Sequence, residues 1–104
     1  MLSGKMGKMM QKAQKAQAEM QQEIAELRCE GTAGGGVVTA VVDGQKNVMD
    51  LKISAEALEE ADAEMLQDLV LAAIHEAQRT ADSEVQQKVD ALSQKLGLPP
   101  GMGL

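Results

Sequence analysis

The chain has 104 residues, a formal net charge of −6 and no Phe, Tyr or Trp. This length fits one domain, and an apolar content of 44% excludes a wholly disordered chain. Because aromatic rings are absent, the chain cannot bind single strands by stacking bases on rings. The core must be built from Met, Leu, Ile, Val and Ala, and so small a core favours burial against a second copy.

The charge is unevenly distributed. Residues 1–18 carry four lysines and no acidic residue, so that segment has a charge of +4. The remaining residues carry six basic and sixteen acidic side chains, a net charge of −10. The acidic total argues against a protein that coats nucleic acid with its whole surface. An anionic partner must therefore bind the first segment.

The sequence predicts a soluble cytoplasmic protein without a membrane partner. Cys29 is the only cysteine, so an internal disulfide is excluded, which suits a reducing compartment. The first residues lack the apolar stretch of a signal peptide. The longest apolar run, residues 69–74, is far shorter than the roughly 20 residues that span a bilayer.

The first predicted element is a long helix over residues 4–28, rich in good helix formers. Its apolar positions follow spacings of four and three, which place them on one narrow stripe of the helix. The stripe consists of Met6, Met10, Ala13, Gln17, Met20, Ile24 and Leu27, with Gln17 as its one polar member. This near-heptad face predicts packing against another helix, a sheet or a second subunit.

A small antiparallel sheet is predicted next. Gly34-Gly35-Gly36 ends any regular element, and the β-branched run at 37–42 follows as a central strand. Asp43-Gly44 begins a turn, and residues 48–54 form the return strand, with Met49, Leu51 and Ile53 expected on one face. A short third strand is expected near residues 29–33.

A long C-terminal helix is predicted over residues 63–96. Ser54 is expected to cap a short helical turn, and Asp62 to cap the long helix. Leu66 to Ala77 supply one apolar stripe, and Val85 to Leu96 supply a second, rotated by roughly a quarter turn. The second half is therefore expected to bend or to pack against a different partner. Gly97 and the two following prolines predict a domain over 1–97 and a flexible tail over 98–104.

Catalytic and cofactor sites are not predicted. His75 is the only histidine and lies opposite the apolar stripe of its helix, where solvent exposure is expected. Cys29 has no evident partner and is expected to be a small apolar residue at a helix–strand junction. The three glycines lead into a strand, whereas a phosphate-binding loop leads into a helix. We expect no enzyme, no cofactor, no metal and no small-molecule substrate.

The spacing of the N-terminal lysines is the one pattern in the sequence that suggests a binding function. Lys5, Lys8, Lys12 and Lys15 step by three, four and three residues. On a helix they form a ridge within an arc of roughly 80°, away from the apolar stripe. The ridge continues into Glu19, Glu23 and Glu26, so the sign of its charge reverses. Two interpretations stay open: a solvated face that confers solubility, or a row of amines that follows phosphates.

Four segments in the same order resemble a known family. They are Met9-Met10-Gln11-Lys12-Ala13-Gln14-Lys15-Ala16-Gln17, Glu30-Gly31-Thr32-Ala33-Gly34-Gly35-Gly36-Val37-Val38, Glu64-Met65-Leu66-Gln67-Asp68-Leu69-Val70 and Leu98-Pro99-Pro100-Gly101. Together they resemble the YbaB/EbfC family of bacterial nucleoid-associated proteins. The resemblance implies an α+β fold with a short sheet between two helices. It further implies a tweezer-like homodimer that binds double-stranded DNA in the nucleoid.

The residues assigned to these roles come from the patterns above. DNA-binding candidates are Lys5, Lys8, Lys12 and Lys15, with Arg79, Lys88 and Lys95 as weaker candidates on the second long helix. Candidates for core or dimer packing are Met6, Met10, Met20, Ile24, Leu27, Val38, Val42, Val85 and Leu92. The expected function is nucleoid organisation and gene regulation by a homodimer bound to backbone phosphates. The alternative is a protein–protein scaffold or chaperone-like adaptor without direct DNA binding, which the methionines and acidic excess favour.

Overall fold

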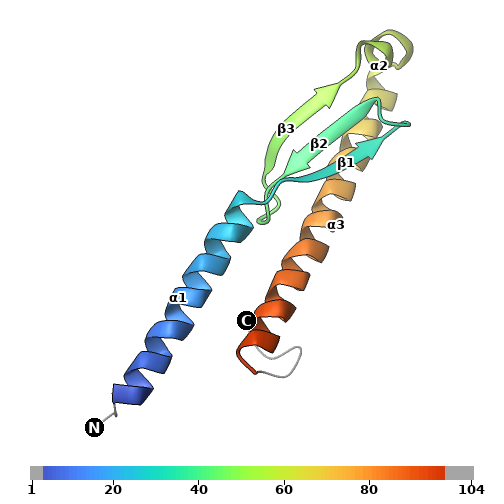
Figure 1. Cartoon of the computed structure of the whole chain (residues 1–104). Helices are drawn as coiled ribbons and strands as arrows, with labels where there is room; N and C mark the ends of the chain where they lie inside the picture. The colour runs from blue at the N-terminus through green and yellow to red at the C-terminus, as the bar shows by residue number, and fades with distance from the viewer. Residues whose placement is uncertain (1–3, 98–104) are drawn as a thin grey trace.

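Two long helices extend from a small sheet in a computed structural model that describes residues 4–97 (Figure 1). The elements are α1 (Gly4–Glu26), β1 (Cys29–Ala33), β2 (Val38–Val42), β3 (Val48–Ile53), α2 (Ala55–Glu60) and α3 (Ala63–Lys95). The molecule is elongated, with extents of 69 × 21 × 16 Å. The predicted α+β order of helix, three strands and helix is confirmed. The predicted tail over 98–104 lies outside the described residues.

The sheet is an antiparallel meander in the order β1-β2-β3. Gly31 pairs with Ala40, and Ala40 pairs with Leu51, so these residues share one face. The regular alternation predicted for Met49, Leu51 and Ile53 is wrong at its first member. Asp50 pairs with Val41 but Val48 pairs with Val42, so Met49 is the extra residue of a β-bulge.

The core lies between the sheet and the first half of α3. Seven buried side chains form it: Cys29, Val38, Ala40, Val42, Ala73, Ala77 and Ala81. The small alanines let α3 approach β1 closely. A methyl group on Gly31 would overlap the backbone nitrogen of Ala77 and the carbonyl oxygen of Ala73. Gly31 is therefore required by the contact between β1 and α3.

The helix ends follow local capping chemistry. The Ser54 hydroxyl accepts a 3.1 Å bond from the Ala57 N–H, and Asp62 Oδ1 accepts a 2.8 Å bond from the Met65 N–H. Both caps were predicted. α1 ends at Glu26, two residues before the prediction. There the Arg28 guanidinium donates to the carbonyl oxygen of Ala25 at 3.2 Å, which satisfies a helix-terminal acceptor.

Beyond the sheet, α3 continues as one uninterrupted helix beside α1 (Figure 1). Leu92 of the second apolar stripe lines a groove shared with α1, so this half of α3 faces α1 and no longer the sheet. Packing of this stripe against a second subunit stays a prediction. α1 has no buried residue and projects from the sheet as an arm. We call residues 4–18 of α1 the distal arm.

Candidate nucleic-acid interface

The distal arm carries a continuous series of exposed amines. Lys5, Lys8, Lys12 and Lys15 are all exposed along α1, as predicted. None of the four forms an ion pair with another residue of the described range 4–97. Their charges are therefore available to a ligand. We call these four residues the lysine ridge.

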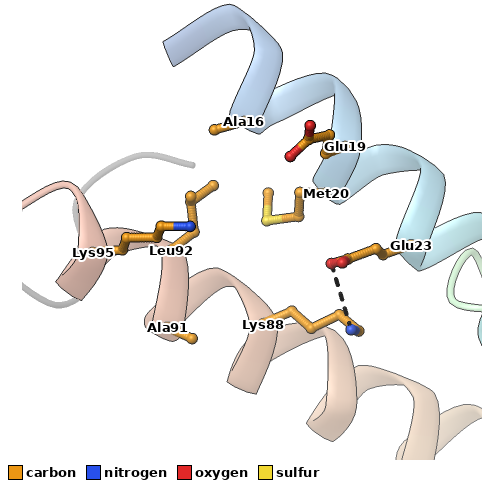
Figure 2. A pocket seen from close by; sticks show the side chains of 8 residues that line it. All are labelled: Ala16, Glu19, Met20, Glu23, Lys88, Ala91, Leu92 and Lys95. Carbon is orange, nitrogen blue, oxygen red and sulfur yellow. Dashed lines mark ion pairs between the residues drawn. The ribbon is translucent and has the colours of Figure 1, made fainter. Parts of the chain in front are cut away.

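The lysine ridge leads into a groove between α1 and α3. Figure 2 shows the groove, which has a volume of about 270 Å³. It is lined by Ala16, Glu19, Met20, Glu23, Lys88, Ala91, Leu92 and Lys95. Glu19 follows Lys12 by seven residues, which is roughly two turns, and Glu23 follows Glu19 by four. Both glutamates therefore extend the ridge along the same side of α1. The ridge therefore lies next to the side of α1 that faces α3.

The basic candidates on α3 have different surroundings. Lys88 Nζ lies 3.6 Å from Glu23 Oε2, and the side chain of Lys88 is only 33% exposed (Figure 2). Lys95, in the last helical turn, lines the same groove. Arg79 precedes Lys88 by nine residues, which places it about half a turn away around the helix. The structure thus brings Lys88 and Lys95 to the α1 side, and leaves Arg79 off it.

The packing candidates are divided between the core and more open positions. Val38 and Val42 are fully buried, and Leu27 packs against the same cluster. Ile24, Val85 and Leu92 are half-buried, as is Met20 in the groove. Met6 and Met10 are each 53% exposed in the single chain. Their packing against a second chain stays a prediction.

Sequence reasoning missed an uncovered apolar face beside β3. α3 lies under β1 and β2 and leaves β3 largely open (Figure 1). A groove of about 560 Å³ runs along this edge, lined by Ile53, Ala63, Leu66, Gln67, Val70 and Leu71. Val48, Leu51 and Leu71 are 48%, 38% and 53% exposed nearby. We call Val48, Leu51, Ile53, Leu66, Val70 and Leu71 the β3 face. The one sign of this face in the sequence is Leu71, an apolar residue that lies off the stripe formed by Leu66 and Val70.

The thiol of Cys29 is not activated. Cys29 is 2% exposed, and its Sγ donates a 3.2 Å hydrogen bond to Glu84 Oε2. Burial, then this bond and the carboxylate charge, raise the pKa of the thiol to about 11. A neutral thiol is a poor nucleophile at physiological pH.

Two kinds of site are absent from the described part of the chain. Across residues 4–97, no group of three or more His, Cys, Asp or Glu side chains is placed to hold a metal ion. Among the helices of the same range, none has the length and hydrophobicity that a transmembrane segment needs. His75 is exposed, as expected from its position opposite the apolar stripe.

Comparisons with known proteins agree with this arrangement. The model of the YbaB/EbfC DNA-binding family matches residues 3–96. A nucleoid-associated protein of Pelotomaculum thermopropionicum is 40% identical over 95% of this chain and 97% of its own. One from Exiguobacterium sp. is 49% identical over 79% of this chain and 78% of its own. A nucleoid-associated protein of Agrobacterium fabrum is 40% identical over 99% of this chain and 95% of its own.

A solved structure shares the fold. The crystal structure of an uncharacterized protein from Helicobacter pylori superimposes with a TM-score of 0.64. It covers 92% of this chain and 98% of its own, at 18% sequence identity. The match of the family model over nearly the whole chain, together with relatives at 40% identity, establishes the assignment. This chain belongs to the YbaB/EbfC DNA-binding family.

Proposed function

We propose that this chain is a nucleoid-associated protein that binds double-stranded DNA as a homodimer in the bacterial cytoplasm, with a role in nucleoid organisation and gene regulation. Family membership and the names of the relatives support the class of ligand. The lysine ridge is the observation that carries the proposal. Four exposed amines, which have no carboxylate partner among residues 4–97, follow one side of a helix for about three turns.

The lysine ridge suits phosphates better than base edges. Lysine acts as a point charge, whereas direct base recognition depends on forked donors such as Arg, Asn or Gln. The distal arm has no arginine, asparagine or aromatic side chain, and its three glutamines lie outside the arc of the lysine ridge. Binding therefore depends on the backbone and on duplex shape, with little direct readout of sequence.

The β3 face supplies the surface for the homodimer. In the described part of the chain no helix covers β3, and α3 presents the exposed Leu71 beside the open groove. If α3 of a second copy fills this groove about a two-fold axis parallel to the helices, each β3 gains a helical cover. This arrangement also points both pairs of arms in the same direction, as a tweezer requires.

Dimerisation doubles the local positive charge. Two copies present eight ridge lysines, although each chain has a net charge of −6. If each arm neutralises about two to four phosphates, log affinity falls with log salt with a slope of roughly −4 to −7. The acidic remainder of the molecule limits nonspecific coating and confines DNA to the arms.

The decisive experiment compares two variants with the same loss of charge. Lys12→Gln/Lys15→Gln removes two ridge amines, and Lys46→Gln/Lys52→Gln removes two amines near the sheet. We expect the ridge variant to lose about tenfold or more in affinity for duplex at low salt, with a shallower salt slope. The sheet variant should lose much less. Equal losses in the two folded variants would overturn the assignment to the ridge.

The dimer is tested separately. Leu71→Asp places a charge in the β3 face, and Leu58→Asp places one on α2, where Leu58 is 60% exposed. We expect light scattering to give a monomer for Leu71→Asp and a dimer for Leu58→Asp, with both folded by circular dichroism. The monomeric Leu71→Asp variant should also bind duplex DNA more weakly than the wild type. If Leu71→Asp remains a dimer, the β3 face is not the interface.

The adaptor function is the competing outcome. If the wild-type protein fails to retard duplex at low salt and instead co-purifies with one specific protein, the adaptor function replaces DNA binding.

A further inference from the structure

The molecule has opposite charges at its two ends. The distal arm carries four lysines and no acid, whereas residues 55–68 carry six acids and no base. The acidic residues are Glu56, Glu59, Glu60, Asp62, Glu64 and Asp68. They lie on α2 and the start of α3, at the far end of a molecule 69 Å long (Figure 1). We call this end the head.

The head contains an apolar groove with an acidic rim. The groove has a volume of about 310 Å³ and lies between α2, the β1–β2 turn and the start of α3. Ala57, Val37 and Leu69 supply apolar walls, and Glu56 and Glu60 line it as well. Met65, 56% exposed, borders it. This groove lies on the flank of α3 opposite the β3 face, so a dimer formed through the β3 face leaves it accessible.

The distal arm has the complementary pattern. Met9 is 65% exposed, the highest value among the exposed large apolar side chains of the described residues. It follows Lys5 by four residues and precedes Lys12 by three, so all three lie on one side of the helix. An apolar side chain flanked by two amines matches an apolar groove flanked by two carboxylates.

We propose that the distal arm of one molecule docks in the head groove of another, with Met9 in the groove and Lys5 and Lys12 against Glu56 and Glu60. The occupant must come from a second copy, because the arm and the head lie at opposite ends of the same chain. The contact is heterologous, and because the arm and the head lie at opposite ends of an elongated molecule, it continues end to end into open assemblies.

Charge determines when these assemblies form. Exposed pairs are screened beyond about 8 Å at physiological salt, so the contact weakens steeply as salt rises. Duplex DNA uses the same lysines under the proposed function, so a short duplex should compete with docking. Self-association and DNA binding are thus alternative uses of one arm. The docking itself does not depend on DNA binding.

Charge reversal provides the test, measured by sedimentation velocity at low salt without DNA. Lys5→Glu/Lys12→Glu changes the arm, and Glu56→Lys/Glu60→Lys changes the two carboxylates that line the head groove. We expect the wild type to form species larger than the dimer at low salt and to lose them in high salt. Each variant alone should lose them.

Mixing the two variants should restore the large species, because a glutamate arm then meets a lysine head. Met9→Gln, which keeps every charge, should weaken assembly several-fold. A wild type that remains a dimer at low salt, or a mixture that does not recover, would overturn the proposal. The head variant retains the whole lysine ridge, so it should bind duplex at least as well as the wild type. Loss of assembly with DNA binding intact separates this proposal from the proposed function.

Discussion

The backbone N–H of Gly44, in the turn between β2 and β3, donates a 3.0 Å hydrogen bond to the carbonyl oxygen of Ile24 near the end of α1. A methyl group on Gly44 would overlap that same oxygen and the side chain of Ile24. This close approach joins the sheet to the base of the arm. The direction in which α1 leaves the sheet is therefore set by a backbone contact, in addition to side-chain packing.

Replacing Gly44 by Ala should displace the arm. We expect a broader distribution of distances between spin labels at positions 14 and 94, introduced in a Cys29→Ala background, and a lower Tm. Gly7→Ala is the matched control, because a methyl group there meets nothing within 4 Å. That control should leave the distances unchanged and raise helix stability by a few tenths of a kcal/mol. An unchanged distribution in Gly44→Ala would show that the contact does not orient the arm.

Gly31→Ala should be much more damaging. The added methyl group collides with the backbone of α3 at Ala73 and Ala77, which cannot move aside as a flexible side chain can. We expect a loss of about 3 kcal/mol or more in the free energy of unfolding, measured by urea denaturation. Thr32→Ala, at the exposed neighbouring position, should cost less than about 1 kcal/mol. Similar costs for the two variants would contradict the close packing of β1 on α3.

Asp43 should make stability dependent on acid pH. Its carboxylate accepts hydrogen bonds from the Asn47 side chain at 3.0 Å and from the backbone of Asn47 and Gln45 at 2.9 Å. These bonds, led by the Asn47 side chain, hold the pKa of Asp43 below its ordinary value of 3.8. Because the pKa is lower in the folded state, the stabilisation is present above pH 3.8 and is lost as the pH falls through the folded value.

Asp43→Asn tests this dependence on pH, and Asp68→Asn is the matched control. We expect Asp43→Asn to lower the Tm at pH 7, and the difference from wild type to shrink progressively below pH 3.8. Asp68→Asn, at an exposed position of α3, should follow the wild-type curve. A constant Tm difference at every pH would mean that the Asp43 charge is irrelevant.

Cys29 should make stability dependent on alkaline pH. Its pKa is raised from 9.0 to about 11, first by burial and then by Glu84. The folded state therefore favours the neutral thiol, and its advantage declines as the pH rises from 9 toward 11. We expect the stability difference between wild type and Cys29→Ala to fall over that range by about 3 kcal/mol at most. A difference that stays flat would show that folding does not raise the pKa of the thiol.

Glu23→Gln should strengthen DNA binding. The substitution removes an acidic group from the end of the lysine ridge and frees Lys88, whose ion pair with Glu23 spans 3.6 Å. We expect a higher affinity for duplex and a steeper salt slope, with a stability change below about 1 kcal/mol. Glu26→Gln loses the same charge without freeing Lys88. If both variants gain affinity equally, Lys88 does not contact DNA.

Local patterns determined much of this protein without a structure. The stripe from Met6 to Leu27 required a helix, and the Ser54 and Asp62 caps marked where the next two begin. The lysine ridge also followed from sequence alone, because residues three and four apart share a side of any helix. Family membership was likewise recognisable from the order of four short segments.

Tertiary structure decided how these elements meet. Periodicity gives the face of a helix but not its neighbour, so the ion pair between Glu23 and Lys88 could not be read from spacing. The bulge at Met49 depends on the register between β2 and β3, and the need for Gly31 depends on how closely α3 approaches β1. The open β3 face arises because one helix covers only part of a three-stranded sheet. These features come from contacts between residues distant in sequence, which local propensity does not encode.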